Sequence, residues 1–491
     1  MQLDVRIVVP GLPIHFPDPF AVPLGGSETA GLQLAKAMVA LGHRATVFCN
    51  VVQPFAWRGV SLMPIDLFPQ MGSMLNCDLL LVQRNPSYFG LRNSAKVAML
   101  WVHDLMQGRK LPELTGAMHA VDRILAVSEW QRDQYLKIAT DLLPEDFLVG
   151  RNGVDLELVS ETLDNTKVSR DPKRIVYASR PERGLQVLLE QILPKIMAEE
   201  PDASLHIAYY DVPNPTIEPY YDYLRRTAAA FGDRVVWHEG LAKPDLYRLY
   251  ASSGLYLYPT PAPVDPSFAE TSCISVMEAM ACGLPWLSSN RGALAETVGK
   301  AGHLIDLGTA AHAGEGDIPD QFAKAALDIM RAPGLAEAMI DQGRERARFF
   351  GWQAVASTVA STTVEIAANA CRNRYALARH FLQRQDIAAA RMVVDQAADE
   401  DGLDPQLAEV RDYLDQRYAH TKSAEALAKF YDSTVGPGNG HVAASLMEAP
   451  RERFKDQVFS RYQVLRNLIA QQSLHLREGK PIRILDWGCS Q

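Results

Sequence analysis

The stretch Glu270-Thr-Ser-Cys-Ile-Ser-Val-Met-Glu278-Ala-Met-Ala-Cys-Gly-Leu-Pro285 places two glutamates around the start of a short helical run. Its closing Gly-Leu-Pro is typical of a helix end. The preceding residues 255–258 predict a strand, and the four prolines between 259 and 266 predict an irregular loop. A helix that opens after such a loop presents free N–H groups, which bind anions. The two glutamates could therefore bind hydroxyl groups on two parts of one ligand, and the amides between them could bind an anionic group of the same ligand.

Short apolar runs alternate with amphipathic segments over residues 1–160 and again over 161–350. This alternation predicts two parallel sheets covered by helices, with a polar linker at 160–173. Two doubly wound domains in tandem would place a ligand cleft between the carboxyl ends of their sheets. The expected strands are Arg6–Val9, Ala45–Cys49, Leu79–Gln83, Ala98–Val102, Ile124–Val127, Phe147–Val149, Arg174–Ala178, Ser204–Tyr209, Val235–Trp237, Leu255–Tyr258 and Leu284–Ser288.

The rest of the chain has a different character. Residues 351–420 show no strand pattern, and Tyr375–Arg391 followed by 397–405 resembles one tetratricopeptide-type helical hairpin, which must pack on something else. Within 421–491, Ile484-Leu-Asp-Trp-Gly-Cys-Ser490 resembles the first motif of a class I S-adenosylmethionine methyltransferase. The resemblance implies a truncated methyltransferase domain, with S-adenosylmethionine as cofactor only of the missing downstream part.

Bulk composition excludes several classes of function. The 491 residues carry a formal net charge of −9, which argues against nucleic acid as the main partner. The six cysteines are scattered, and no His/Cys set has zinc spacing, so we expect no metal site. The chain starts on a strand pattern rather than a signal peptide, and no apolar run reaches membrane-spanning length. We therefore expect a soluble, cytoplasmic protein; a lipid-linked acceptor would add peripheral contact with the inner face of the cell membrane.

In each expected domain, one motif suited to phosphate binding follows the first strand. Gly25-Gly26-Ser27-Glu28 precedes the first helix, where paired glycines let a phosphate approach; the alternative is a tight turn with Ser27 as the N-cap. Arg180 and Arg183 suit a diphosphate, which arginine binds bidentately. The alternative for these arginines is a solvated turn paired with Glu182.

His103 follows the fourth expected strand, again at a carboxyl end. Its imidazole could hydrogen-bond a substrate hydroxyl or stabilise positive charge that develops on the substrate during the reaction. The alternative is a structural role. The turn Asn152-Gly153-Val154-Asp155 predicts a positive φ at Gly153. Tyr256 and Tyr258 are expected to face the core rather than a ligand.

Taken together, these motifs resemble those of GT-B-fold glycosyltransferases, in particular glycosyltransferase family 4, which retains the anomeric configuration. The resemblance covers about residues 1–370, and the paired-glutamate stretch is its most specific part. It implies two Rossmann-like doubly wound domains facing across a cleft, plus a C-terminal helical region. It also implies transfer of a sugar from a nucleotide-diphosphate sugar to a hydroxyl of a glycan or lipid-linked acceptor, without a metal.

The resemblance assigns a role to each matching residue. Glu278 would accept hydrogen bonds from the ribose hydroxyls, and Glu270 would contact the donor sugar. Arg180 and Arg183 would neutralise the departing diphosphate, and His103 would contact the sugar. Gly25 and Gly26 would line the diphosphate and the acceptor side. The backbone amides of Thr271, Ser272, Cys273 and Ile274 would help Glu270 to bind the donor sugar.

Two departures from the family pattern stand out. The family commonly has Gly-Phe-Gly where this chain has Thr271-Ser272-Cys273, and a lysine is usual at the position of Arg183. Three alternatives stay open: a GT-B sugar phosphorylase, a nucleotide-sugar epimerase with His103 as its clear acid/base candidate, and a non-catalytic nucleotide-sugar-binding scaffold for a methyltransferase. A methyltransferase partner would suggest a role in bacterial surface glycan synthesis.

Overall fold

In the computed structural model the chain forms two compact units, Met1–Ala370 and Cys371–Gln491. The expected methyltransferase motif at 484–490 lies outside the described residues. The structure describes residues 1–419 except for positions 23, 70–76, 90–94, 107–109, 119–120, 140–141, 165–167, 210–214, 262, 308–316, 369–373, 376–377, 379–381, 383–386, 401–402 and 404.

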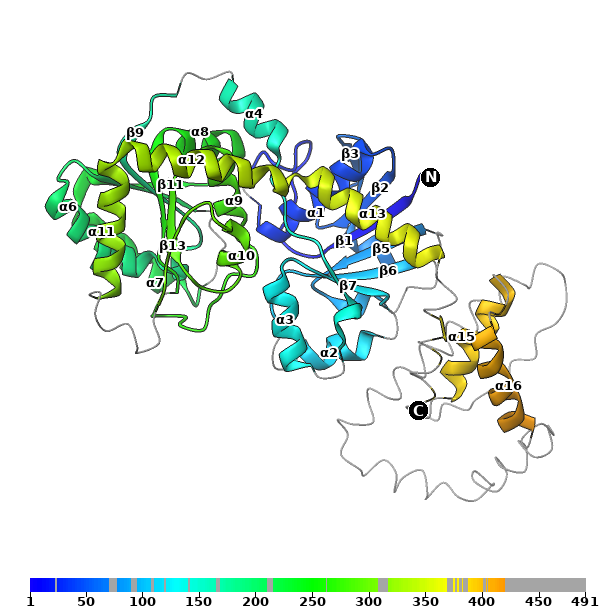
Figure 1. The fold of residues 1–491 in the computed structure, drawn as a ribbon. Helices are drawn as coiled ribbons and strands as arrows, with labels where there is room; N and C mark the ends of the chain where they lie inside the picture. The colour runs from blue at the N-terminus through cyan, green and yellow to red at the C-terminus, as the bar shows by residue number, and fades with distance from the viewer. Residues whose placement is uncertain are drawn as a thin grey trace. The chain divides into compact units, whose positions relative to one another are not determined.

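The N-terminal half of the first unit is built on an eight-stranded sheet (Figure 1). Neighbouring strands are parallel except for the β3–β4 pair, and the order is β3-β4-β2-β1-β5-β6-β7-β8. Side chains of the central strand alternate between two apolar clusters, because successive residues of a strand point to opposite faces: Val5, Ile7 and Val9 join one cluster and Val8 the other. The strands are β1 (Asp4–Val9), β2 (Arg44–Cys49), β3 (Phe55–Trp57), β4 (Val60–Pro64), β5 (Cys77–Gln83), β6 (Ala95–Val102), β7 (Arg123–Ala126) and β8 (Phe147–Val149).

Helices cover both faces of this sheet, and one of them comes from the far end of the unit. Helix α13 lies beside α1 (Figure 1), and its Trp352, Val355 and Val359 enter the same apolar cluster as β1. The chain therefore returns to the N-terminal half after completing the second sheet. The helical elements here are α1 (Gly26–Ala40), η1 (Ile65–Leu67), α2 (Lys110–Ala117), α3 (Glu129–Ile138), η5 (Pro144–Asp146) and α13 (Trp352–Ala368).

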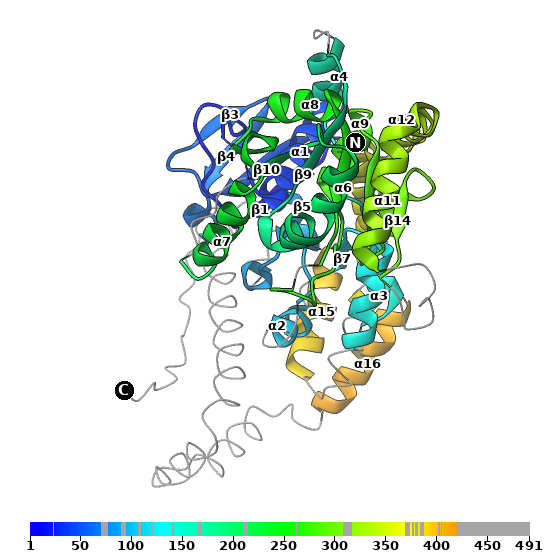
Figure 2. The same ribbon diagram turned by 90° about the vertical axis from the view of Figure 1, so that its left-hand side faces the viewer.

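The C-terminal half is a six-stranded parallel sheet in the order β11-β10-β9-β12-β13-β14. Helices surround it in both views (Figure 1 and Figure 2). Its strands are β9 (Asp171–Ala178), β10 (Ser204–Tyr209), β11 (Val235–Glu239), β12 (Ser253–Tyr258), β13 (Trp286–Ser289) and β14 (His303–Ile305). Its helical elements are α4 (Leu156–Asp164), η6 (Pro181–Arg183), α5 (Leu185–Val187), η7 (Leu188–Ile192), α6 (Leu193–Glu199), α7 (Glu218–Ala229), η8 (Gly232–Arg234), α8 (Lys243–Ala251), α9 (Ile274–Ala281), α10 (Leu294–Val298), α11 (Ile318–Arg331), α12 (Pro333–Ala347) and η9 (Arg348–Phe350).

The order of strands confirms the expected fold class. In each sheet the first strand is central, the next strands build outward on one side, and the order then reverses on the other side. Such sheets bind ligands at the carboxyl ends of the strands where the order reverses. These switch points lie between β1 and β5 in the first sheet and between β9 and β12 in the second.

Every expected strand is present, but three others were missed. Strands β3 and β4 form a hairpin through Arg58 and Gly59, both at positive φ, and β14 is a three-residue edge strand. Three-residue edge strands such as β3 and β14 carry too little periodicity to be recognised in the sequence. The expected polar linker at 160–173 is partly wrong, because α4 extends to Asp164 and β9 begins at Asp171.

The expected positive φ at Gly153 is also wrong, since this residue is not among the positive-φ glycines. A Cβ there would lie 2.7 Å from Trp352 Cδ2 and 2.8 Å from Phe350 O. The two segments that join the halves run together at this point, where Val154 N–H donates to Phe350 O at 2.6 Å. Residue 153 must therefore be glycine because the chain that returns from the C-terminal half passes too close to leave room for a side chain.

The described part of the second unit contains α15 (Ile387–Glu400) and α16 (Pro405–Ala419), which pack through a small apolar cluster that includes Val394, Leu407 and Leu414. The structure thus shows two packed helices, and α15 runs without a break from the first expected segment, 375–391, into the second, 397–405. The tetratricopeptide resemblance stays a prediction.

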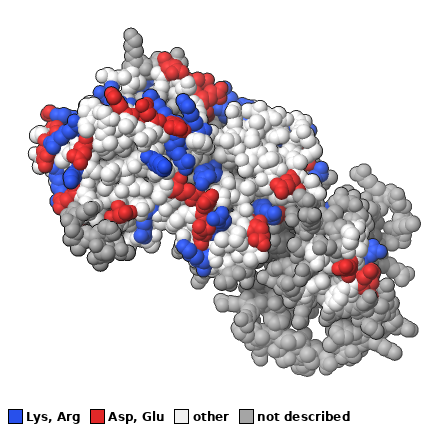
Figure 3. All heavy atoms as spheres, in the orientation of Figure 1, with Lys and Arg blue, Asp and Glu red and all other residues white. Residues whose placement is uncertain are grey.

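On the face shown in Figure 3, basic and acidic side chains are intermixed over the first unit. None of the helices in the described residues is long and apolar enough to cross a membrane.

Candidate functional site

The segments after β9 and β12 meet at the switch point of the second sheet. Arg183 ends η6, just after β9, and its Nη1 lies 3.7 Å from Glu270 Oε1. Gly184 makes this meeting possible: it has φ +128°, and a Cβ there would lie 2.4 Å from Pro259 O. The two expected site residues, distant in sequence, are therefore brought together.

Glu270 is 6% exposed and is held from two sides. The Tyr258 hydroxyl donates to its Oε1 at 2.6 Å, and the Ala293 N–H donates to its main-chain oxygen at 2.7 Å. Burial, followed by the nearby Glu270 charge, raises the pKa of Tyr258 well above its usual value, so its hydroxyl stays a donor. Tyr258 is buried as expected, but sequence reasoning missed that it also orients Glu270.

Glu278 is 3% exposed in α9, and its Oε1 accepts hydrogen bonds from Lys243 Nζ at 2.5 Å and from the Tyr247 hydroxyl at 3.2 Å. Both partners lie on α8, and sequence reasoning missed them. One signal was available, because Lys243 opens a helix directly after β11, at the same carboxyl edge.

The two glutamates share one arrangement. Among the described residues, every side-chain hydrogen bond or ion pair of Glu270 and Glu278 uses Oε1. A cation beside each carboxylate offsets the cost of burying its charge. The Oε2 atoms can accept hydrogen bonds from hydroxyl groups of a ligand.

The start of α9 lies between these carboxylates. Its N-cap residue Cys273 makes no side-chain capping hydrogen bond, and the buried Ser272 hydroxyl has no partner among the described residues. Burial raises the pKa of the Cys273 thiol, which therefore stays neutral. The amides of a helix start, with the unpartnered Ser272 hydroxyl beside them, are suited to an anion.

Arg180 pairs with a residue of its own turn, whereas Arg183 lies beside Glu270. Arg180 Nε pairs with Glu182 Oε1 at 2.7 Å, and the other Glu182 oxygen accepts from the Tyr221 hydroxyl at 2.5 Å. The predicted pairing with Glu182 is therefore present. The planar guanidinium of Arg183 instead lies over the Phe268 ring, 4.7 Å from its centroid.

His103 lies on the N-terminal side of the site, just after β6. Its ring packs against Trp101 at 4.7 Å between centroids, and its buried Nε2 has no hydrogen-bond partner among the described residues. Burial, with a smaller contribution from Arg84, lowers the pKa of His103 to about 3. The imidazole is therefore neutral near pH 7, with a polar atom suited to a hydrogen bond from or to a ligand.

A network that sequence reasoning missed surrounds the first helix start. Arg84 donates from Nε to Asp104 Oδ2 at 3.0 Å and from Nη1 to Ser27 Oγ at 3.1 Å. Although burial opposes the effect, the Arg84 charge lowers the pKa of Asp104. The expected N-cap at Ser27 is wrong: Gly25 is the N-cap, and the Ser27 hydroxyl donates to Glu28 instead.

The paired glycines differ in the space around them, because only a Cβ on Gly25 would clash with a neighbouring atom. A Cβ on Gly25 would lie 2.3 Å from Glu28 Oε2, whereas one on Gly26 would lie 3.6 Å from Ile274 Cδ1 in the other half. The halves meet again where the Thr271 hydroxyl donates to His103 O at 2.7 Å. The carboxyl edges of the two sheets thus contribute to one site.

The described residues hold no cluster of three or more His, Cys, Asp or Glu side chains that could bind a metal. Metal independence of the reaction stays a prediction.

The architecture is that of the GT-B fold. Sucrose-phosphate synthase from Thermosynechococcus elongatus superposes with a TM-score of 0.56 at 16% identity, covering 75% of this chain and all of that one. The Anabaena protein HepE in complex with UDP-glucose gives a TM-score of 0.54 at 16% identity, covering 74% and 100% of the two chains.

The family match lies in the C-terminal half of the first unit. Residues 172–332 match the family model described as "Glycosyl transferases group 1". Spore coat protein SA of Bacillus subtilis (strain 168) is 30% identical over 183 residues, which are 36% of this chain and 45% of that protein. D-inositol 3-phosphate glycosyltransferase of Corynebacterium glutamicum (strain R) is 26% identical over 261 residues, 50% and 58% of the two chains. The match thus spans about half the length of these relatives.

Proposed function

We propose that this chain is a retaining glycosyltransferase that moves a sugar from a nucleotide-diphosphate sugar to a hydroxyl acceptor. One observation carries the proposal: two buried carboxylates, Glu270 and Glu278, lie on either side of a helix start, each with a cation at its Oε1. This set suits a ligand with hydroxyl groups at both ends and an anion in the middle. A nucleotide-diphosphate sugar has that order of groups.

In this proposal, Glu278 accepts from the ribose hydroxyls while Lys243 holds its other oxygen. Arg180, Arg183 and the amides at the start of α9 take the diphosphate, because cations and a helix start both favour negative charge. Glu270 then binds hydroxyls of the sugar. A relative from Mycolicibacterium smegmatis is named as GDP-mannose-dependent, and HepE was crystallised with UDP-glucose, which supports this class of donor.

The reaction breaks the bond between the anomeric carbon and the diphosphate oxygen and forms a bond from that carbon to the acceptor oxygen on the same face. The acceptor proton passes to the departing diphosphate, which Arg180 and Arg183 stabilise as charge develops. Glu270 acts through hydrogen bonds and not as a nucleophile, unlike the carboxylate pair of a retaining hydrolase. In this proposal neutral His103 contacts the sugar, and Gly25 and Gly26 line the diphosphate and the acceptor side.

The biological setting that we propose is bacterial surface glycan synthesis on the cytoplasmic side, with a glycan or lipid-linked acceptor. We retain 1–160 and 161–350 as the two domains, 351–420 as the helical crossover and linker, and 421–491 as the start of a methyltransferase domain.

Release of nucleoside diphosphate tests the proposal most directly. The base of the donor is narrowed down first, by measuring how much UDP, GDP, ADP and dTDP each raise the melting temperature of the protein. Sugars of the nucleotides that stabilise the protein are then tested as donors. Acceptor-dependent release supports transfer, whereas binding without release would support the scaffold alternative. Phosphate-dependent formation of a sugar 1-phosphate would indicate a phosphorylase, and a donor converted to its epimer would indicate an epimerase.

A further inference from the structure

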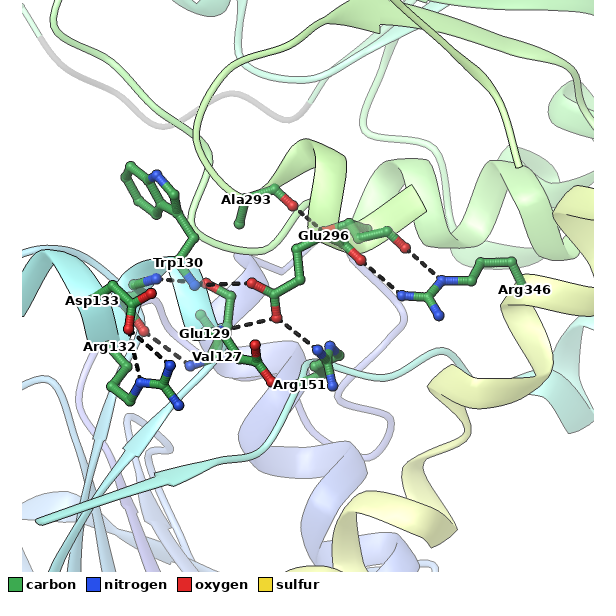
Figure 4. A network of polar contacts seen from close by, with 12 residues as sticks. Val127, Glu129, Trp130, Arg132, Asp133, Arg151, Ala293, Glu296 and Arg346 are labelled. Atoms are coloured by element: carbon green, nitrogen blue, oxygen red, sulfur yellow. Dashed lines mark hydrogen bonds and ion pairs between the residues drawn. The ribbon is translucent and has the colours of Figure 1, made fainter. Parts of the chain in front are cut away.

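Glu296, which none of the motifs above includes, joins the two halves of the first unit (Figure 4). It lies on α10 in the C-terminal half. Its Oε1 accepts from the Glu129 N–H and its Oε2 from the Trp130 N–H, both at 2.9 Å, at the start of α3. Arg151, on the segment that leaves the N-terminal half, donates to Oε1 at 2.7 Å.

The geometry is that of a helix cap supplied from another part of the chain. The first amides of a helix lack partners within it and carry partial positive charge. The side chain of Ser128, the N-cap of α3, accepts from the Gln131 N–H at 3.0 Å. Glu296 satisfies the two preceding amides, so the start of α3 is complete only when the C-terminal half is in place.

The other side of α10 is anchored within its own half. Arg346 of α12 donates to the main-chain oxygens of Thr297 at 2.9 Å and Glu296 at 2.7 Å. The residue before α10, Ala293, donates its N–H to Glu270 O. One short element thus connects the loop that holds the proposed sugar-binding carboxylate with the N-terminal half.

We infer that Glu296 is a positioning residue, whose contact with α3 holds the two halves in the arrangement where the Thr271 hydroxyl reaches His103 O. Charge-assisted hydrogen bonds to two amides and a guanidinium fix direction as well as distance. The inference rests on the proposed function only for its catalytic consequence. The holding of the two halves is a property of the fold and is measured without turnover.

The distance between the halves is measured first, in the full chain. Spin labels are placed on V52C and L335C, which are exposed positions in the N-terminal and C-terminal halves, with Cys371 and Cys489 replaced by Ser. The four cysteines of the described residues are buried. With Glu296 intact we expect a narrow distribution of distances, with and without UDP or GDP. We expect E296A and E296Q to broaden it, and E296Q keeps the size of the side chain should E296A fold poorly.

The matched control is D133N, which removes an ion pair with Arg132 inside α3 and touches nothing in the C-terminal half among the described contacts. For transfer, we expect E296Q to lower kcat about tenfold and to change the Kd for nucleoside diphosphate less than about twofold, since the charged side chains that we propose for the nucleotide, Glu278, Arg180 and Arg183, all lie in the C-terminal half. Distances and kcat that match D133N would overturn the inference. Broadened distances in a chain that transfers no sugar would instead refute the proposed function and leave the coupling of the halves standing.

Discussion

The Thr271 hydroxyl donates a 2.7 Å hydrogen bond to the main-chain oxygen of His103, across the junction of two sheets that are separate in the sequence. The contact joins the loop after β12 to the end of β6. It places Glu270, the residue before Thr271, close to the N-terminal half. A family pattern with glycine at this position would have no hydroxyl to make the bond.

The first prediction concerns this hydroxyl. Thr271→Val keeps the shape of the side chain and removes the donor, so that about 0.5–1.5 kcal/mol of net interaction is lost. We expect kcat/KM to fall about threefold to tenfold, while Thr271→Ser retains most of the activity. Equal kcat/KM values for the Val and Ser variants would contradict the role that we assign to the bond.

Removal of the Glu278 charge should weaken nucleotide binding. Glu278→Gln leaves Lys243 beside an uncharged group and reduces hydrogen bonding to the ribose, so we expect about a tenfold or greater rise in the Kd of the preferred nucleoside diphosphate. Titration calorimetry measures it. Lys243→Met in the same chain should recover thermal stability without recovering affinity; recovery of both would show that Glu278 acts only through packing.

Substitution of Glu270 or Arg180 by alanine should abolish transfer in a protein that remains folded. Loss of groups that stabilise developing charge lowers kcat by about 100-fold or more. Tyr258→Phe, which removes the hydrogen bond to Glu270 and a longer one from the Ser179 hydroxyl, should have a smaller effect on kcat, about fivefold to twentyfold. Circular dichroism and thermal melting verify the fold, and near-normal transfer by E270A or R180A would refute the site.

The buried neutral imidazole of His103 should make the protein sensitive to acid. Its folded-state pKa of about 3 lies below the usual value of 6.5, so the unfolded state binds a proton more readily. The contribution to stability is complete above about pH 6.5 and is lost as the pH falls towards 3, by about 2 kcal/mol between pH 7 and pH 5.

His103→Gln removes this titration. The difference in the free energy of unfolding between wild type and H103Q, measured in urea at pH 5 and at pH 7, should therefore change by that amount. This comparison separates His103 from His206, whose pKa burial lowers to about 4. A difference independent of pH would show that His103 is not buried in the neutral form.

Much of the fold followed from local patterns. Apolar runs of strand length alternate with helical periodicity, and each central strand is buried on both faces, so both sheets could be placed from residues that are neighbours in the chain. The positions of Glu270, Arg183 and His103 at strand ends followed from the same alternation, because carboxyl ends of parallel strands lie at one edge. Short edge strands such as β14 were not predicted, because three residues are too few to show a periodic pattern.

The tertiary structure decided which side chains complete the site. Lys243 and Tyr247 reach Glu278 from another helix, and Glu296 reaches the start of α3 from the other half of the unit. Such pairings depend on how elements pack, and no local periodicity specifies them. The same holds for Gly153, whose lack of a side chain is required by Trp352, a neighbour in space that lies far along the chain. The sequence by itself thus determined the two sheets and the order of the motifs, whereas packing determined the partners of each charge.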